Sequence, residues 1–234
     1  MSAIRTLWLI PARGGSKGIP NKNIKLFCGK SLVKRAVEQA LQLAGENDMV
    51  FVSTDSPIIK EEVETTGVKI PFFRPSHLST DTASTYSVIR HVLDQLEIAG
   101  ENFDRVILLQ PTSPLRHLND IKGASELWTP EIDMVVSVCE AKANPYFNAF
   151  EKNQEGYLHI SKGDGKYVRR QDAPKVWEYN GAVYVMSVPA LLKGPISSFT
   201  KIVPFEMDSS RSVDLDTPQD WMLAEYLYSQ SNKN

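Results

Sequence analysis

The segment best suited to bind a polyanion lies at residues 10–23, which read IPARGGSKGIPNKN. Its three glycines allow backbone N–H groups to approach a ligand closely and to form an anion-binding concavity. Arg13, Lys17 and Lys22 add side-chain charge, a combination that suits a triphosphate. The residue spacings of a P-loop and of a dinucleotide fingerprint are both missing. A flexible basic loop is the simpler alternative, but three glycines with three cations favour a phosphate site.

The distribution of charge singles out the same end of the chain. Eight Lys and Arg residues, and no Asp or Glu, lie between Met1 and Val37. The whole chain has 26 basic and 28 acidic side chains, which gives a formal net charge of −2. A cationic segment in a near-neutral chain indicates a polyanion site of limited size, or else a positively charged solvated face. The overall balance argues against a nucleic-acid-binding protein, and we expect no nucleic-acid partner.

Two carboxylates near the other end of the chain, Asp214 and Asp216, could bind a divalent cation. Side chains alternate along an extended segment, so both acids would point to the same side of it. Mg²⁺ prefers carboxylates together with substrate phosphates. Two solvated acids ahead of a helix are the more common outcome for a single D-x-D pair. The metal site is favoured only if these acids lie beside the phosphate loop.

A third segment contains groups suited to bind the remainder of a nucleotide. Arg74 and the hydroxyl groups of residues 80–85 could contact a base and its ribose. Within that stretch, Asp81 or Ser84 could instead cap the helix that follows. Taken alone, these residues therefore indicate only weakly a nucleoside site.

Two segments that contain arginine could bind an acceptor molecule. Residues 110–116 (QPTSPLR) place an amide and a cation after a predicted strand, and a rigid proline turn is an equal alternative. Arg169 and Arg170 could grip a carboxylate or could form ordinary surface salt bridges. The four histidines, His77, His91, His117 and His159, have no metal-ligand spacing, and Ser, His and Asp form no nucleophile elbow.

Alternating strands and helices must position these groups. Continuous apolar runs predict strands at 7–10, 49–52, 68–73, 106–109, 134–139, 181–186 and 201–205. Helical periodicity predicts helices around 32–41 (ended by Gly45), 58–63, 88–96, 121–127 and from 218 to about 228, before a frayed tail at 229–234. The alternation predicts an α/β fold with a mostly parallel sheet and flanking helices. Ligands on such sheets bind beyond the carboxyl ends of the strands, where the polar segments above lie.

Length and composition fit one domain. The chain has 234 residues, and residues 140–177 show little helical periodicity, so we predict one domain with an inserted β-rich lobe there. Two cysteines, Cys28 and Cys139, are too few for a disulfide scaffold. The chain lacks an apolar run of roughly 20 residues, and the apolar stretch Thr6–Ile10 is too short for a secretory signal. We expect a cytoplasmic protein with reduced thiols and no membrane partner.

In their order and spacing, these segments resemble those of the CMP-sialic acid synthetases, the acylneuraminate cytidylyltransferases. The matching pieces are IPARGGSKGIPNKN at 10–23, VSTD at 52–55, RPSHLSTDTAST at 74–85, LLQPTSPLR at 108–116, RRQDAP at 169–174, NGAVYV at 180–185 and DLDTPQD at 214–220. The resemblance covers nearly the whole chain, and its first and fourth pieces are the most specific. It implies a nucleotide-diphospho-sugar transferase-like α/β fold, with residues 140–178 as an inserted lobe for dimerisation and for the sugar site.

The resemblance also implies a reaction, a cofactor and partners. In that reaction the anomeric hydroxyl of a nine-carbon 2-keto sugar acid attacks the α-phosphate of CTP, giving the CMP-sugar and pyrophosphate. The implied cofactor is Mg²⁺ and the implied assembly is a homodimer. The implied nucleotide-binding residues are Arg13, Ser16, Lys17, Lys22, Asn23, Arg74, Ala83 and Thr85; the sugar-binding residues are Gln110, Arg170 and Tyr184; the metal ligands are Asp214 and Asp216; and the catalytic residues are Lys17, Lys22, Asp214 and Asp216.

Two departures from the family pattern bear on the sugar. Thr85 stands where many members have serine, which keeps the hydroxyl group. Residues 144–148 (NPYFN) lack a lysine that some neuraminate-using members have there. With RQDAP downstream, this stretch resembles the bacterial legionaminate-type branch.

Two other functions fit parts of the pattern. A nucleotide-sugar glycosyltransferase would use Asp214 and Asp216 as its metal motif, but that motif usually lies mid-chain, and the basic first loop suits a free triphosphate better. A catalytically silent CTP-binding regulator would keep Arg13 and Lys17 but could lose the carboxylates, which are present. We therefore expect a cytidylyltransferase acting on a nonulosonic acid.

Overall fold

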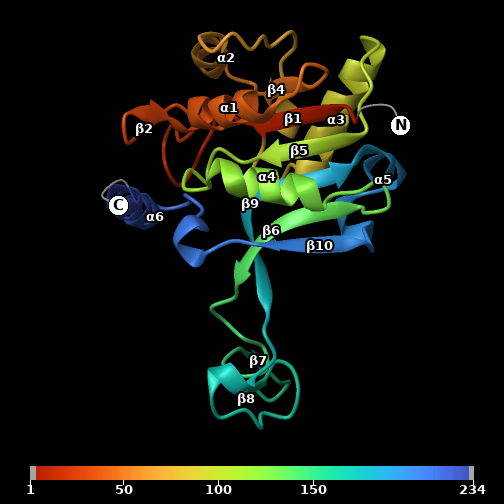
Figure 1. The fold of residues 1–234 in the computed structure, drawn as a ribbon. Coiled ribbons are helices and arrows are strands. Elements are labelled where there is room, and N and C mark those ends of the chain that lie inside the picture. The colour runs from red at the N-terminus through yellow and green to blue at the C-terminus, as the bar shows by residue number, and fades with distance from the viewer. Residues whose placement is uncertain (1–3, 232–234) are drawn as a thin grey trace.

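Runs of apolar residues form the central sheet of the computed structural model, which describes residues 4–231 (Figure 1). Its six strands are β1 (Thr6–Pro11), β4 (Met49–Ser53), β5 (Arg105–Leu109), β6 (Met134–Glu140), β9 (Trp177–Ser187) and β10 (Ile202–Glu206), in the order β10-β6-β9-β5-β1-β4. β9 runs antiparallel to β5 and β6, whereas the other neighbouring strands of this sheet pair in parallel. The predicted mostly parallel α/β sheet is confirmed.

Strand β1 shows why these runs must be apolar throughout. Its side chains alternate between two cores: Leu7 and Leu9 belong to one cluster of buried residues, and Trp8 and Ile10 belong to the other. All four are at most 3 % exposed. A strand that is covered on both faces has no polar side, which explains the continuous apolar run in the sequence.

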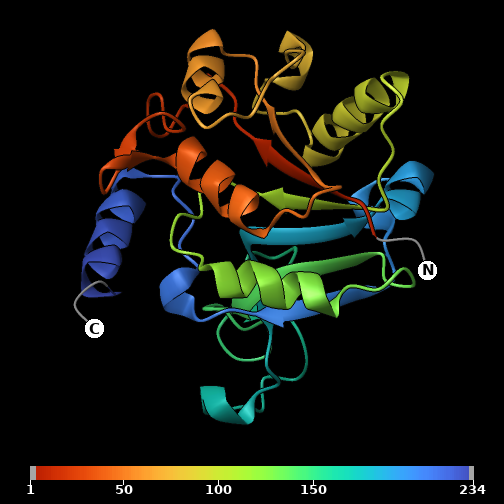
Figure 2. The same cartoon turned by 45° about the horizontal axis from the view of Figure 1, so that its top comes forward.

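The helices of residues 4–231 lie around the sheet, as Figure 2 shows from a second direction. They are α1 (Leu32–Leu43), α2 (Pro57–Glu64), α3 (Thr85–Ile98), α4 (Leu118–Leu127), α5 (Val188–Lys193) and α6 (Pro218–Ser231), and short 3₁₀ turns lie at Ser76–Leu78, Arg170–Asp172, Ile196–Ser198 and Ser209–Arg211. Buried side chains of α1, α2 and α4 pack in the core on one face, and those of α3 and α5 pack in the core on the other. Helix α6 packs against the N-terminal loop through Trp221 and Phe27.

Helix starts follow the sequence signals. Ser31 caps α1 by accepting a hydrogen bond from the backbone N–H of Lys34. At α6, Thr217 and Asp220 exchange side-chain and backbone hydrogen bonds of 2.7–3.2 Å, the reciprocal arrangement of a capping box. Residues 229–231 continue this helix, so their prediction as a frayed tail is wrong, while 232–234 lie outside the described residues.

One predicted strand is corrected by the fold. Residues 68–73 are not a strand, although Val68 and Ile70 are buried. The backbone N–H of Ile70 bonds to the Glu64 carboxylate rather than to a neighbouring strand. Helix α1 ends just before Gly45 as predicted, with Ala44 as the C-cap, and the N–H of Gly45 donates to Asp48.

Two short hairpins supplement the sheet. The long N-terminal loop contains β2 (Leu26–Phe27) paired with β3 (Lys30–Ser31). The segment between β6 and β9 projects from the sheet as a separate lobe (Figure 1), in which β7 (Phe150–Lys152) pairs with β8 (Leu158–Ile160). Most of this lobe is irregular, so "β-rich" overstates its strand content. Within residues 4–231 the structure has no helix both long and apolar enough to span a bilayer.

Candidate active site

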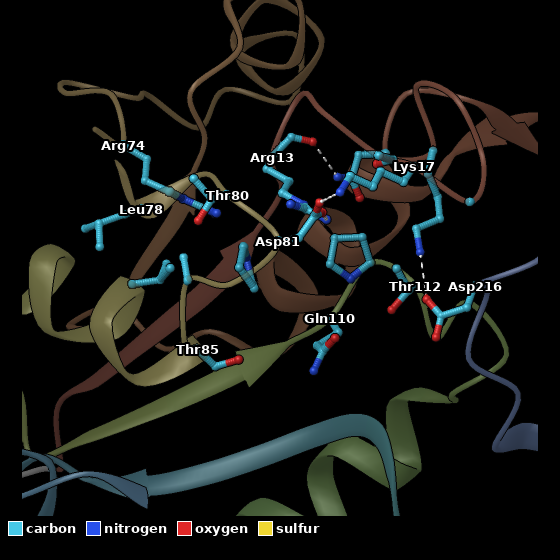
Figure 3. Close-up of a pocket in the computed structure, with 18 residues that line it drawn as sticks. Arg13, Lys17, Arg74, Leu78, Thr80, Asp81, Thr85, Gln110, Thr112 and Asp216 are labelled. Carbon is cyan, nitrogen blue, oxygen red and sulfur yellow. Dashed lines mark hydrogen bonds and ion pairs between the residues drawn. The ribbon is translucent and has the colours of Figure 1, made fainter. Parts of the chain in front are cut away.

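A cleft of about 330 Å³ lies at the carboxyl ends of β1 and β5 (Figure 3). Its walls come from the glycine-rich loop, the segment before α3, the exit of β5 and the segment before α6. The lining residues are Pro11, Arg13, Ser16, Lys17, Gly18, Lys22, Asn23, Arg74, Leu78, Thr80, Asp81, Ala83, Thr85, Val88, Gln110, Pro111, Thr112 and Asp216. All eight predicted nucleotide-binding residues therefore line one cleft, together with Gln110 and Asp216.

The N-terminal loop and the C-terminal acids meet at this cleft. The Nζ of Lys22 donates to the backbone oxygen of Leu215 at 2.5 Å and lies 3.1 Å from Oδ1 of Asp216. Gly18 packs against the same segment so closely that a Cβ atom would lie less than 3.0 Å from the carbonyl oxygen of Asp216. Only a residue without a side chain fits there. The two elements, almost 200 positions apart, thus form one site.

Hydrogen bonds to the backbone fix the loop that carries these cations. The buried side chain of Asn23 donates to the backbone oxygen of Arg13 at 2.9 Å. The backbone N–H of Gly14 donates to Asp55, directly after β4. Asn23 therefore shapes the loop as well as lining the cleft.

Asp81, predicted from the sequence only as a possible helix cap, lies among the cations of the N-terminal loop. Figure 3 shows Asp81 between Arg13 and Lys17. Its carboxylate forms ion pairs with Lys17 and, at 2.5 Å, with Arg13. Hydrogen bonds from Lys17 and then Arg13 hold the pKa of Asp81 below its usual range. The helix cap is Ser84, which accepts from the backbone N–H of Ser87.

The opposite wall of the cleft is built around Arg74. Its guanidinium donates to both the hydroxyl (3.0 Å) and the backbone oxygen (2.5 Å) of Ser53, at the exit of β4. Burial lowers the pKa of Arg74 to about 10. Ala83 and Thr85 flank the N-terminus of α3 on the same side. This wall combines a fixed cation with the positive end of a helix, an arrangement that favours electron-rich ligand atoms.

Asp214 lies deeper than Asp216, whose side chain is 73 % exposed. Its Oδ1 atom is buried and has no hydrogen-bond partner among the described residues, and the same holds for the hydroxyl of Ser113. A Cβ on Gly181 would contact both side chains, at 3.6 and 3.7 Å. Burial, and to a smaller extent the charge of Asp216, raises the pKa of Asp214. Burial followed by the charge of Asp214 raises the pKa of Tyr184 to about 12.

The structure places the predicted sugar-binding residues apart. Gln110 lines the cleft, whereas Arg170 lines a second cavity of about 470 Å³ together with Asp214. The guanidinium of Arg170 donates to the backbone oxygens of Ala141 and Lys142 at the root of the lobe. Tyr184 lies on β9, where its backbone pairs with Leu108 of β5. Tyr184 lines neither the cleft nor this second cavity.

Comparison with known proteins identifies the family. A sequence model described as "Cytidylyltransferase" matches residues 7–217. The chain belongs to the cytidylyltransferase family. The predicted enzyme class, a nucleotidyltransferase, is confirmed by this match.

Relatives of this cytidylyltransferase span its whole length. It is 32 % identical over 225 residues to the CMP-N,N'-diacetyllegionaminic acid synthase of Legionella pneumophila, covering 96 % of each chain. It is 31 % identical over 231 residues to the pseudaminic acid cytidylyltransferase of Campylobacter jejuni, covering 99 % of each. The solved structure of CMP:2-keto-3-deoxy-manno-octonic acid synthetase complexed with CTP superimposes with a TM-score of 0.71 at 20 % identity, over 97 % of this chain and 99 % of the other, and thus confirms the fold.

Proposed function

We propose that this cytidylyltransferase transfers CMP from CTP to the anomeric hydroxyl of a nonulosonic acid and releases pyrophosphate. The observation that carries the proposal is the junction of the cationic glycine loop with the segment of Asp214 and Asp216 at one cleft. Phosphoryl-group transfer depends mainly on positioning and on charge neutralisation, and this junction supplies groups for both. The names of full-length relatives, which act on legionaminic and pseudaminic acids, support the choice of acceptor.

The cleft walls support a division of roles. Arg13, Lys17 and Lys22 would neutralise the triphosphate, and Ser16 and Asn23 would complete the loop that binds it. Arg74, Ala83 and Thr85, on the opposite wall, would bind cytosine and ribose. These assignments place the α-phosphate between the two walls, beside Gln110 at the exit of β5 and Asp216 ahead of α6.

The chemistry of the acid pair fits Mg²⁺. A buried carboxylate oxygen without a partner, on Asp214, lies close enough to Asp216 for their charges to interact. No group of three or more His, Cys, Asp or Glu within residues 4–231 could hold a metal alone, so the substrate phosphates would have to complete the set. When bound by Asp214 and Asp216, the cation would supply charge neutralisation at the phosphates. Asp216, exposed and paired with Lys22, would accept the proton of the attacking hydroxyl.

The sugar acid would lie between Gln110 and the lobe. Tyr184 lies close enough to Asp214 for the charge of Asp214 to act on its hydroxyl, and Asp214 lines the cavity that contains Arg170. In this arrangement Arg170 would contact the sugar acid in the site of a partner subunit, because within one chain Arg170 and Gln110 line different cavities.

We further propose that the enzyme is a cytoplasmic homodimer formed through this lobe. Large apolar side chains are exposed there: Phe150 at 55 %, Tyr157 at 70 %, Leu158 at 66 % and Val168 at 83 %. Exposed apolar clusters of this kind mark interaction surfaces. We expect light scattering to give the mass of a dimer for the wild type and of a monomer for Leu158→Asp. A monomeric wild type would contradict the assembly.

The function is tested with purified enzyme, CTP, Mg²⁺ and a panel of neuraminic, legionaminic, pseudaminic and deaminated sugar acids. We expect pyrophosphate release that depends on the acid, and a product mass equal to the CMP-sugar. Release that requires an acceptor glycan would favour a glycosyltransferase, and CTP binding without release would favour a silent regulator. No release with any acid of the panel would overturn the proposal.

Replacement of Asp81 by asparagine should tighten CTP binding. In the free enzyme its carboxylate neutralises Arg13 and Lys17, so a triphosphate must displace it. We expect Asp81→Asn to lower the Kd for CTP about three- to tenfold at low ionic strength, and the gain to shrink in high salt because exposed ion pairs are screened. Calorimetric titration measures both values.

A matched control is Asp94→Asn, which removes the ion pair to Arg90 on the same face of α3. That variant should leave the Kd for CTP unchanged. Weaker CTP binding by Asp81→Asn would mean that the carboxylate contacts the nucleotide rather than competing with it.

A further inference from the structure

A cavity of about 490 Å³ lies outside the nucleotide cleft and is lined by residues of α1, of the start of α4 with the turn before it, and of the end of α6. We call it the α1–α6 cavity. Its polar lining consists of Arg35, Arg116, His117, the amides of Gln39 and Asn119, and hydroxyl groups. No Asp or Glu contributes to the lining among residues 4–231. The cavity is therefore cationic and has no internal counter-charge.

Arg116 is a buried cation held only by neutral groups. It is 2 % exposed. Its guanidinium donates to the side-chain oxygen of Gln39 at 3.0 Å and to the backbone oxygens of Gln110 and Ala182. Burial and then the charge of Arg35 lower the pKa of Arg116 to about 9. A buried charge compensated by dipoles alone favours the entry of an anion.

Arg35 is the second uncompensated cation. It donates from Nη2 to the backbone oxygen of Phe27 and lies 5.0 Å from the ring centre of Tyr228. Its Nε atom is buried and has no hydrogen-bond partner among the described residues. Within those residues, neither Arg35 nor Arg116 forms an ion pair.

The acids on the same helices are engaged elsewhere. Glu38 of α1 pairs with Lys30, and Asp120 of α4 pairs with Arg211 at 3.0 Å. Glu225 of α6 accepts a hydrogen bond from the indole of Trp221 at 2.9 Å. None of them lines the cavity. A ligand from solution must then supply any negative charge there.

We propose that the α1–α6 cavity binds a phosphate-type oxyanion between Arg35 and Arg116. Guanidinium groups match tetrahedral oxyanions by paired hydrogen bonds, and the amide of Asn119 adds a neutral donor, while the amide of Gln39 is bonded to Arg116 at both ends. The cavity is linked to the cleft, because Arg116 donates a hydrogen bond to the backbone oxygen of Gln110, and Gln110 lines the cleft. An anion bound to Arg116 would thereby change the hydrogen bond that supports Gln110.

The experiment follows the Nε–Hε signals of the arginine side chains by NMR while inorganic phosphate is added to the full chain at constant ionic strength. The Arg35 signal is assigned by its loss in Arg35→Gln. We expect it to shift with phosphate in the wild type. Asn119→Asp, which changes one group and places a carboxylate in the cavity, should weaken the affinity read from this signal by about tenfold or more. Lys17→Ala, which impairs the nucleotide cleft, should leave that affinity within about twofold.

Three outcomes would overturn the proposal. In the first, the Arg35 signal stays fixed at phosphate concentrations that saturate the cleft. In the second, it shifts with equal affinity in the wild type and Asn119→Asp. In the third, it loses its response in Lys17→Ala. The experiment measures binding at Arg35 and involves no turnover. A negative result would therefore leave the proposed cytidylyl transfer standing, and an enzyme inactive in cytidylyl transfer could still bind phosphate in the α1–α6 cavity.

Discussion

The Asp214→Asn variant is expected to lose about 10³-fold or more in kcat while its fold becomes more stable. The loss follows because charge stabilisation at a metal-bound phosphate is worth several kcal/mol. The gain in stability follows because the variant replaces a buried carboxylate whose Oδ1 has no partner within the described residues. Removing such an unpaired charged oxygen should raise the free energy of unfolding at neutral pH by about 1 kcal/mol. Steady-state pyrophosphate release and denaturant unfolding measure the two effects.

Asp208→Asn is the matched control for this variant. Asp208 accepts hydrogen bonds from the backbone N–H and the hydroxyl of Ser210, which lower the pKa of its carboxyl. A lowered pKa means that the carboxylate stabilises the fold above its ordinary pKa, and that this contribution is lost as pH falls through the lowered pKa. Asp208→Asn should therefore lower stability at neutral pH and leave kcat unchanged. If Asp214→Asn keeps more than a tenth of wild-type kcat, Asp214 is not a metal ligand.

The opposite signs expected for these two acids separate structural from functional carboxylates. A carboxylate that serves the fold has its hydrogen bonds satisfied by the fold, as at Asp208. A carboxylate that serves a ligand keeps an oxygen without a partner until the ligand arrives, as at Oδ1 of Asp214 among the described residues. The instability stored at Asp214 is then a cost of function, in line with the general conflict between activity and stability at binding sites.

Local sequence signals were enough to predict most of the elements. Each predicted strand except 68–73 is present, and the caps at Ser31 and Thr217 lie where their side chains indicate. The exception has a physical reason. The buried residues Val68 and Ile70 alternate with exposed ones as in a strand, but Pro71 has no N–H to donate, and the amide of Ile70 bonds to a side chain of α2.

The missed features of the site all depend on contacts between distant residues. Asp81 looks like a cap in sequence because nothing local reveals its pairing with Arg13 and Lys17, more than 60 positions away. Arg116 looks like a ligand-binding cation at a strand exit, yet it does not line the nucleotide cleft and donates to the backbone oxygens of Gln110 and Ala182. Spacing along the chain cannot distinguish an arginine that lines this cleft from one that supports its wall from behind.

Gly18→Ala is expected to lower kcat/KM by about 10²-fold, because its Cβ would overlap the backbone oxygen of Asp216. Neither partner in that overlap is a flexible side-chain end, so the loop or the acid segment must move. Such a movement separates Lys22 from Asp216, which now lie 3.1 Å apart, and withdraws the acid from the phosphate loop. The measurement is kcat/KM for CTP at saturating sugar acid, with the melting temperature recorded to show that the fold is intact.

The matched control for Gly18→Ala is Gly15→Ala, three positions earlier in the same loop. A Cβ there meets no atom within 4 Å, and Gly15 is not among the residues that line the cleft. Both substitutions remove the same backbone freedom from the loop, and neither glycine has a positive φ angle. Equal losses in the two variants would mean that the loop needs flexibility rather than contact with Asp216. A loss confined to Gly18→Ala would show that catalysis depends on the close approach of the two ends of the chain, since only that variant drives them apart.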